Sequence, residues 1–128
     1  MDRKTLRPLT EVELEMMLLI WKLGPSTVHQ VLSLLPKERN LAYTSVSTML
    51  RILEQKSFLK STKDGRSHVY SPLVSKEAYQ SSSAKLFLRR VFDGAPKLLV
   101  KHLIENQKLS TDDLRDIQKL LEERTRGG

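Results

Sequence analysis

One stretch of this chain, residues 41–57, gathers hydroxyl side chains and a guanidinium at helical spacing. Its apolar residues recur with the period of a helix that buries one stripe: Val46, Met49, Leu50 and Leu53. The polar residues fall on the other side of that helix: Thr44, Ser45, Ser47, Thr48 and Arg51. Short side chains let a helix enter a DNA major groove about 12 Å wide, where hydroxyls and guanidinium groups bond base edges or phosphates. The segment predicts a DNA-recognition helix, with an ordinary amphipathic helix as the alternative.

A basic β hairpin is expected directly after this helix. Asp64-Gly65 is a strong tight-turn signal, and apolar pairs flank it at Phe58-Leu59 and Val69-Tyr70. The hairpin carries the basic side chains Lys60, Lys63, Arg66 and His68. A helix followed by a basic hairpin is the order of a winged helix-turn-helix, in which the hairpin contacts the phosphate backbone. A solvated surface loop is the alternative for this segment.

Two further helices are predicted before the recognition helix. Thr10 and Glu13 match a capping box, so the first helix should begin there and end before Gly24-Pro25. Its expected core stripe is Leu14, Met17, Leu18 and Trp21. The second helix, residues 26–35, has Thr27 and Gln30 at capping-box spacing and should bury Val28, Val31, Leu32 and Leu35. Because helix N-termini favour anions, Thr27 fits either a phosphate contact or an ordinary cap.

The chain beyond residue 73 is expected to be wholly helical and to serve dimerisation. We place a boundary there, with a DNA-binding domain over 1–73 and a helical domain over 74–128. Helices are predicted over 75–92 and 96–104, with a third beginning after Ser110. Short helices cannot bury so many apolar residues by themselves, so a subunit interface is expected at Phe87, Leu88, Val91, Leu99, Leu103, Leu114, Ile117 and Leu121. A dimer would place two recognition helices about 34 to 36 Å apart.

The charge balance favours an anionic partner. The 128 residues contain 22 Lys and Arg against 15 Asp and Glu, a formal net charge of +7. Double-stranded nucleic acid is the first expectation and an anionic membrane surface the second. The excess is spread along the chain: residues 1–73 hold 11 basic and 7 acidic side chains, and residues 74–128 hold 11 and 8. Only the charges of the hairpin have a specific placement.

Several classes of function are disfavoured by what the chain lacks. It has no cysteine, which excludes disulfides and thiolate metal sites and suits a reducing cytoplasm. The longest apolar run, 16–21, is far shorter than the roughly 20 residues that span a membrane, and no signal peptide precedes it. The three histidines have no metal-ligand spacing, and no catalytic constellation is present. We therefore expect a cytoplasmic protein that is not an enzyme and needs neither metal nor cofactor.

These segments together resemble the penicillinase-repressor (BlaI/MecI) family of bacterial winged-helix regulators. The resemblance is carried by LTEVELEMMLLIWKLGPSTVHQVLSLL, LAYTSVSTMLRILEQKSFL and KDGRSHVYSPLVSKE, and by the helical tail over 85–123. It implies a homodimer that binds a palindromic operator and represses transcription, with the tail helices interleaved between subunits. It also implies that Thr44, Ser45, Ser47 and Thr48 contact the operator, with Arg51 one turn further along. Tyr43, at the start of the helix, fits a phosphate contact or packing.

The resemblance has departures that bear on regulation. Antibiotic-responsive members are cut at an Asn-Phe bond in the tail, and the aligned position here is Lys101-His102. Copper-responsive relatives use a cysteine cluster, which this chain lacks. Ser57 stands where the family usually has Gly, a position that only needs a residue able to end a helix. Release of repression would then depend on an unidentified sensor or inducer.

Two other classes of function fit parts of the sequence. A protein-interaction adaptor built on a winged helix, without specific DNA binding, would account for the broad apolar surface of the first helix and for the tail. An architectural DNA-binding protein without sequence preference would account for the charge, although not for so compact a polar face.

Overall fold

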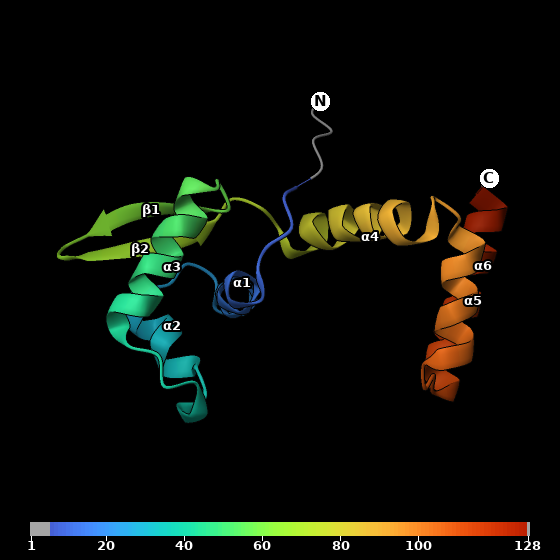
Figure 1. Cartoon of the computed structure of the whole chain (residues 1–128), viewed down its shortest axis with the longest axis horizontal. Helices are drawn as coiled ribbons and strands as arrows, with labels where there is room; N and C mark the ends of the chain where they lie inside the picture. The colour runs from blue at the N-terminus through green and yellow to red at the C-terminus, as the bar shows by residue number, and fades with distance from the viewer. Residues whose placement is uncertain (1–5, 128) are drawn as a thin grey trace. The chain divides into compact units, whose positions relative to one another are not determined.

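The computed structural model describes residues 6–127, which form helices and one antiparallel hairpin. In chain order the elements are α1 (Glu11–Leu23), α2 (Val28–Leu34), a 3-10 turn (Lys37–Arg39), α3 (Tyr43–Gln55), β1 (Leu59–Asp64), β2 (Ser67–Pro72), α4 (Lys76–Phe92), α5 (Pro96–Asn106) and α6 (Thr111–Gly127). The described residues divide into two compact units, 6–84 and 85–127. The prediction of a mainly α fold with a small hairpin, arranged as a winged helix-turn-helix, is confirmed (Figure 1).

Capping boxes fix the starts of the first two helices, as predicted. The Thr10 hydroxyl accepts from the Glu13 N–H at 3.2 Å, and the Glu13 carboxylate accepts from the Thr10 N–H at 2.9 Å. Thr27 and Gln30 make the same reciprocal pair at the start of α2. Each pair satisfies backbone donors that a helix start leaves without partners. The first helix ends at Gly24, whose φ of 83° few other residues adopt readily.

The core of the first unit lies where α1, α2, α3 and the hairpin meet. Its fully buried side chains include Met16, Met17 and Ile20 of α1 and Leu50 and Leu53 of α3. The predicted α1 stripe was wrong in its rotation: Met17 is buried, but Leu18 is 43% exposed, and Leu14 and Trp21 are only half-buried. Apolar residues surround most of α1, so their spacing alone could not fix which side faces inward.

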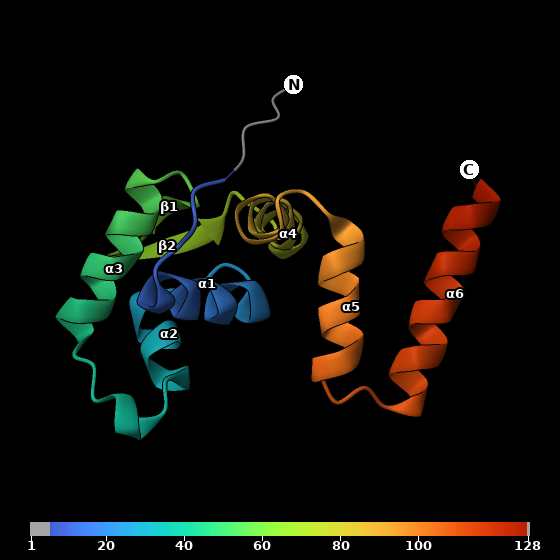
Figure 2. The same ribbon diagram turned by 45° about the vertical axis from the view of Figure 1, so that its right-hand side comes forward.

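In α2 the structure buries fewer residues than expected. Val28 and Val31 are buried, as predicted, whereas Leu32 and Leu35 are only partly buried against the core. The helix ends at Leu34, and Leu35 and Pro36 connect it to the 3-10 turn that leads to α3. In Figure 2 the chain leaves α2, passes through the 3-10 turn and continues into α3, which lies beside α1 and α2.

The hairpin pairs β1 with β2 in a register that joins Asp64 to Ser67. Its two central turn residues are therefore Gly65 and Arg66, one position beyond the predicted Asp64-Gly65 turn. Gly65 has a φ of 64°, and a two-residue turn with glycine first suits the right-handed twist of the strands. A bridge to Ser26 extends the sheet: Ser26 N–H donates to the Tyr70 carbonyl at 2.9 Å, and Tyr70 N–H donates back at 2.8 Å.

The beginning of α4 packs on the winged-helix unit. The Tyr79 hydroxyl accepts from the Leu9 N–H at 2.8 Å, and the Trp21 indole donates to the Val74 carbonyl at 2.8 Å. The Tyr79 ring lies against the rings of Trp21 and Phe58, with centroid distances of 6.0 and 5.8 Å. Because of these contacts, the first compact unit includes the beginning of α4 and ends at residue 84. A division of function after residue 73 stays a prediction.

The second unit is built from the end of α4 with α5 and α6, and α5 and α6 run in opposite directions (Figure 2). Ser110 caps α6, as predicted: its hydroxyl accepts from the Asp113 N–H at 2.9 Å. Phe92 packs edge-on against Phe87 and also contacts the His102 ring. Among the described residues from 85 to 127, no side chain is fully buried. The eight predicted dimerisation residues all lie in this unit and are exposed or half-buried.

Candidate nucleic-acid interface

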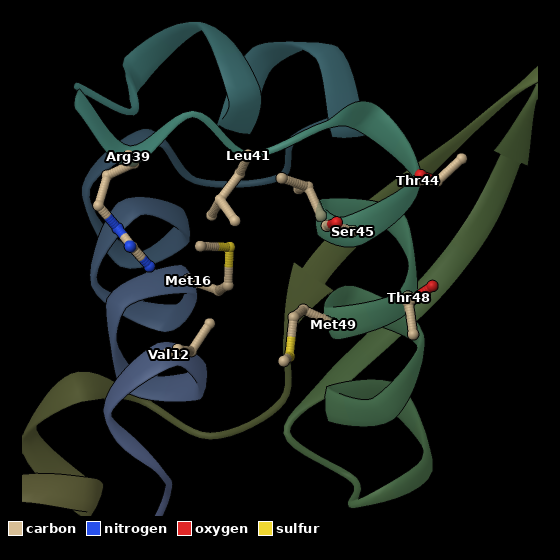
Figure 3. Close-up of a pocket in the computed structure, with 9 residues that line it drawn as sticks. Val12, Met16, Arg39, Leu41, Thr44, Ser45, Thr48 and Met49 are labelled. Atoms are coloured by element: carbon tan, nitrogen blue, oxygen red, sulfur yellow. The ribbon is translucent and has the colours of Figure 1, made fainter. Parts of the chain in front are cut away.

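The solvent side of α3 carries a continuous polar stripe. Thr44, Thr48 and Arg51 are exposed at spacings of i, i+4 and i+7, opposite the buried Val46 and Leu50. Figure 3 shows Thr44 and Thr48 on the side of α3 that is turned away from α1. Gln55, also exposed, continues this line by one more turn. We call Thr44, Thr48, Arg51 and Gln55 the outer stripe. Gln55 was missed by sequence reasoning, although its spacing of i+7 from Thr48 signals its place.

The two serines of the predicted face lie on its flanks. Ser45 is exposed on the flank toward α1, where it lines a groove, and Ser47 is half-buried on the opposite flank. The structure therefore brings three of the five predicted residues into one line and places the serines beside it. Tyr43, at the start of the helix, is 44% exposed and contacts the ring of His29 at a centroid distance of 4.6 Å. This contact joins the beginnings of α2 and α3.

A largely apolar groove of about 470 Å³ runs between α1 and the first half of α3. Met16 and Leu41 point into it in Figure 3, with Met49 on the α3 side. Thr44, Ser45 and Thr48 form its polar margin. The groove separates the outer stripe from α1 and leaves the N-terminal half of α3 accessible from that side.

An ion pair with α1 holds the C-terminal end of α3. Lys56 Nζ lies 2.6 Å from Glu13 Oε2, and the Glu13 side chain is only 5% exposed. Burial by itself would raise the pKa of this carboxyl, but hydrogen bonds from Lys56 and the Thr10 backbone, with the charge of Lys56, hold the pKa below its ordinary value. Glu13 is thus a buried carboxylate kept ionised by its partners, and it fixes one end of α3 against α1.

The hairpin is attached to α3 by a side-chain hydrogen bond. The Ser61 hydroxyl donates to Glu54 Oε2 at 2.7 Å. Its cross-strand partner Tyr70 is buried, and this burial, with the nearby charge of Glu54, raises the pKa of the Tyr70 hydroxyl despite the opposing charge of Arg51. The hairpin therefore packs directly beneath the second half of α3, and its position follows that of the helix.

All four basic residues predicted for the hairpin are exposed, but they do not share one face. Lys63 and His68 are cross-strand partners, so they lie on the same face of the hairpin as Ser61 and Tyr70, which face α3. Lys60 is the neighbour of Ser61 in β1, so it lies on the opposite face of the hairpin, where it is paired with Ser71. Arg66 occupies the turn. The tip thus presents Lys63, Arg66 and His68 toward the side of α3.

Thr27 is engaged within its own helix. Its hydroxyl accepts from the Gln30 N–H at 3.2 Å and lies 3.4 Å from the Gln30 amide oxygen. The capping role accounts for this side chain, and its contact with a phosphate stays a prediction.

In the part of the chain that the structure describes, no helix is long and apolar enough to cross a membrane, and no group of three potential ligands could hold a metal ion.

Helices α1, α2 and α3 form a three-helix core, α3 carries the polar outer stripe, and a basic hairpin lies beside it. This arrangement defines a winged-helix DNA-binding protein. Residues 9–123 match the family model described as "Penicillinase repressor". The chain is 30% identical over 120 residues to the penicillinase repressor of Bacillus licheniformis, covering 94% of each chain. It is 25% identical over 121 residues to the methicillin resistance regulatory protein MecI of Mammaliicoccus sciuri, covering 94% of this chain and 98% of that protein.

The solution structure of the DNA-binding domain of the repressor BlaI is similar to part of this chain. It is 31% identical, covers 61% of this chain and 94% of that chain, and superposes with a TM-score of 0.51. The chain therefore belongs to the penicillinase repressor family, whose members are transcriptional repressors rather than enzymes. The expected family resemblance is confirmed.

Proposed function

We propose that this protein is a homodimeric repressor that acts in the cytoplasm by binding a palindromic operator. The observation that carries the proposal is the outer stripe of α3: short hydroxyls and one guanidinium lie on the solvent side of a helix whose other side is anchored by Leu50 and Leu53. A helix anchored through its inner side can present small polar groups on its outer side to base edges. The similarity to a penicillinase repressor and to the DNA-binding domain of the repressor BlaI supports the same conclusion.

The proposed contacts divide into those that discriminate sequence and those that position the protein. We assign base contacts to the outer stripe, with Ser45 and Ser47 at its flanks and Tyr43 at the phosphate beside the helix start. We assign phosphate contacts to the wing, through Lys60, Lys63, Arg66 and His68. Because Lys60 lies on the opposite face of the hairpin from Lys63, its contribution should be the smaller of the two.

Dimerisation is proposed for the second unit. Its helices expose apolar side chains that they do not bury against one another, among them Val91 at 58% and Leu121 at 62% exposure. Exposed apolar surface of this extent is typical of a protein interface. Two-fold symmetry would then pair two winged helices with two half-sites. The signal that makes the protein release its operator would come from an unidentified sensor or inducer, because a chain without cysteine cannot sense copper through a cysteine cluster.

The experiment that tests the proposal is binding of purified protein to a labelled duplex from its own upstream region, beside scrambled DNA of equal length, over a salt series. Saturable preference of about a thousandfold or more for the upstream duplex is expected at physiological salt. Equal and steeply salt-dependent binding to both duplexes would reduce the role to general charge attraction. Absence of binding to either would favour the protein-interaction adaptor.

A further inference from the structure

A two-pronged ion pair ties the turn before α3 to α1. Arg39, the last residue of the 3-10 turn, donates from Nε to Glu15 Oε2 and from Nη2 to Glu15 Oε1, both at 2.8 Å. The two side chains are 37% and 30% exposed. A fork of two parallel hydrogen bonds fixes orientation as well as distance, which a single contact between long side chains does not. The pair therefore holds the turn in one position relative to α1.

The N-terminal end of α3 has no second ion pair or side-chain cap among the described residues, and its other restraints are the Tyr43–His29 ring contact and the buried Val46. Its N-cap residue, Ala42, offers no side-chain hydrogen bond, unlike Thr10 and Thr27 at the first two helices. The preceding Asn40 is left-handed, with a φ of 47°, and Leu41 is only half-buried beside the groove. Between the 3-10 turn and the first buried α3 residue, the ion pair is thus the main polar tether to α1.

The other end of α3 is secured independently. Lys56 pairs with the buried Glu13, Ser61 bonds Glu54, and Phe58 and Leu59 are buried immediately after the helix. Two carboxylates of α1, Glu13 and Glu15, thus hold the two ends of the recognition helix. Loss of the Glu15 tether should free the N-terminal end alone, which carries Thr44 and Thr48.

We propose that Glu15 and Arg39 are positioning residues for DNA recognition: their ion pair sets the orientation of the N-terminal turns of α3 without either side chain contacting DNA. The inference rests on the proposed operator binding. Recognition helices contact base edges mainly with their N-terminal residues, so a small rotation of this end would move Thr44 and Thr48 out of hydrogen-bonding range. Contacts of the wing with phosphates would be unaffected.

The competing role for Arg39 is a direct phosphate contact, and the two roles predict opposite effects for the partner. If Arg39 binds phosphate, removing the Glu15 charge should free the guanidinium and add one unit of positive charge, so binding to every duplex should strengthen. If the pair positions α3, Glu15→Gln and Arg39→Gln should both weaken operator binding, although they change the net charge in opposite directions.

The binding test compares Glu15→Gln, Arg39→Gln and the control Lys37→Gln, a charge removal in the same 3-10 turn. Lys37 is exposed and makes no ion pair among the described residues. We expect Glu15→Gln and Arg39→Gln each to lower operator affinity about 3- to 10-fold, with the salt slope and the affinity for scrambled DNA unchanged. Tighter binding of Glu15→Gln to both duplexes, or a salt slope lowered by about 1 in Arg39→Gln only, would overturn the inference.

Hydrogen exchange of the DNA-free variants provides a test that does not depend on the operator. Both variants should exchange faster than wild type at residues 46–49, the first hydrogen-bonded amides of α3, beginning with the Val46 N–H that donates to the Ala42 carbonyl. Residues 50–59 should exchange at the wild-type rate, which also shows that the fold is intact. If the wild-type protein shows no operator preference, the proposed function fails and exchange alone decides the positioning role. Unchanged exchange at residues 46–49 in both variants would overturn that role.

Discussion

The Glu13 carboxylate joins the N-terminal cap of α1 to the end of α3. Its Oε1 accepts from the Thr10 N–H at 2.9 Å, and its Oε2 lies 2.6 Å from Lys56 Nζ. One buried side chain thus completes a capping box and an ion pair that spans 43 positions of sequence. Because both oxygens have partners, the charge can remain in a nearly dry environment. The orientation of α1 and the position of α3 therefore depend on the same residue.

Replacing Lys56 with Met should destabilise the first unit by about 2 kcal/mol, because the buried Glu13 carboxylate would lose its charged donor while its burial remained. The measurement is the free energy of unfolding from urea denaturation at pH 7. Lys22→Met, at an exposed lysine in the last turn of α1, is the matched control and should change stability by less than about 0.5 kcal/mol. Equal effects of the two substitutions would contradict the structural role of the pair.

Stability should fall in acid as Glu13 is protonated. The pKa of this carboxyl is lowered from the ordinary value of 4.5, so the folded state binds a proton less readily than the unfolded chain. The resulting stabilisation is fully present above about pH 5 and is lost as the pH falls through 4.5 toward the lower folded-state pKa. Urea midpoints between pH 7 and 3 measure this slope. The slope should be shallower in Glu13→Gln, which keeps the capping-box geometry; an identical slope in that variant would assign the acid sensitivity to other carboxyls.

Thr48→Ala should lower affinity for the operator about 3- to 10-fold while leaving the affinity for scrambled DNA nearly unchanged. Thr48 lies at the middle of the outer stripe, where a hydroxyl can reach a base edge. Fluorescence anisotropy with both duplexes measures the ratio. Thr62→Ala, at an exposed threonine of β1, removes the same hydroxyl from the hairpin and should not alter the ratio. An equal loss of affinity for both duplexes would indicate that Thr48 contacts a phosphate rather than a base.

Lys63→Ala should weaken binding to all sequences and lower the slope of log affinity against log salt by about 1, because one phosphate contact is lost. Lys60→Ala is the natural comparison, since it removes the same charge from the same strand but from the opposite face of the hairpin. Titrations at four or more salt concentrations give both slopes. An effect of Lys60→Ala as large as that of Lys63→Ala would show that the orientation of the hairpin does not matter for the contact.

Local signals allowed several elements to be predicted from sequence. The capping boxes at Thr10 and Thr27 and the cap at Ser110 depend on residues three positions apart, so spacing alone identifies them. Three of the four residues predicted for the buried stripe of α3, Val46, Leu50 and Leu53, are buried, whereas Met49 is only half-buried beside the groove. The prediction succeeded there because polar residues occupy the other side of the helix and leave a single choice of face. Where one face is clearly polar, helical periodicity determines burial.

Other features depend on contacts between distant residues and were not predicted. The observed rotation of α1 turns Glu13 toward Lys56, and nothing in the sequence indicates that these two residues, 43 positions apart, form a pair. The strand alternation that separates Lys60 from Lys63 follows from a register fixed by the Gly65-Arg66 turn, one position from the predicted one. A shift of one residue in a strand reverses the face of a side chain, so small errors of register change the composition of a site.

The apolar side of α6 should form part of the dimer interface, and Leu121→Asp should disrupt it. Leu114, Ile117 and Leu121 lie along one side of this helix and are 48%, 36% and 62% exposed. A symmetric dimer buries each leucine twice, so a charge there should raise the dimer dissociation constant about 100- to 1000-fold. Sedimentation velocity over a concentration series measures it. Lys119→Gln, on the opposite side of α6, makes the same change in net charge and should leave the dimer intact. If Leu121→Asp sedimented like the wild-type dimer, the interface would have to lie on another face of the second unit.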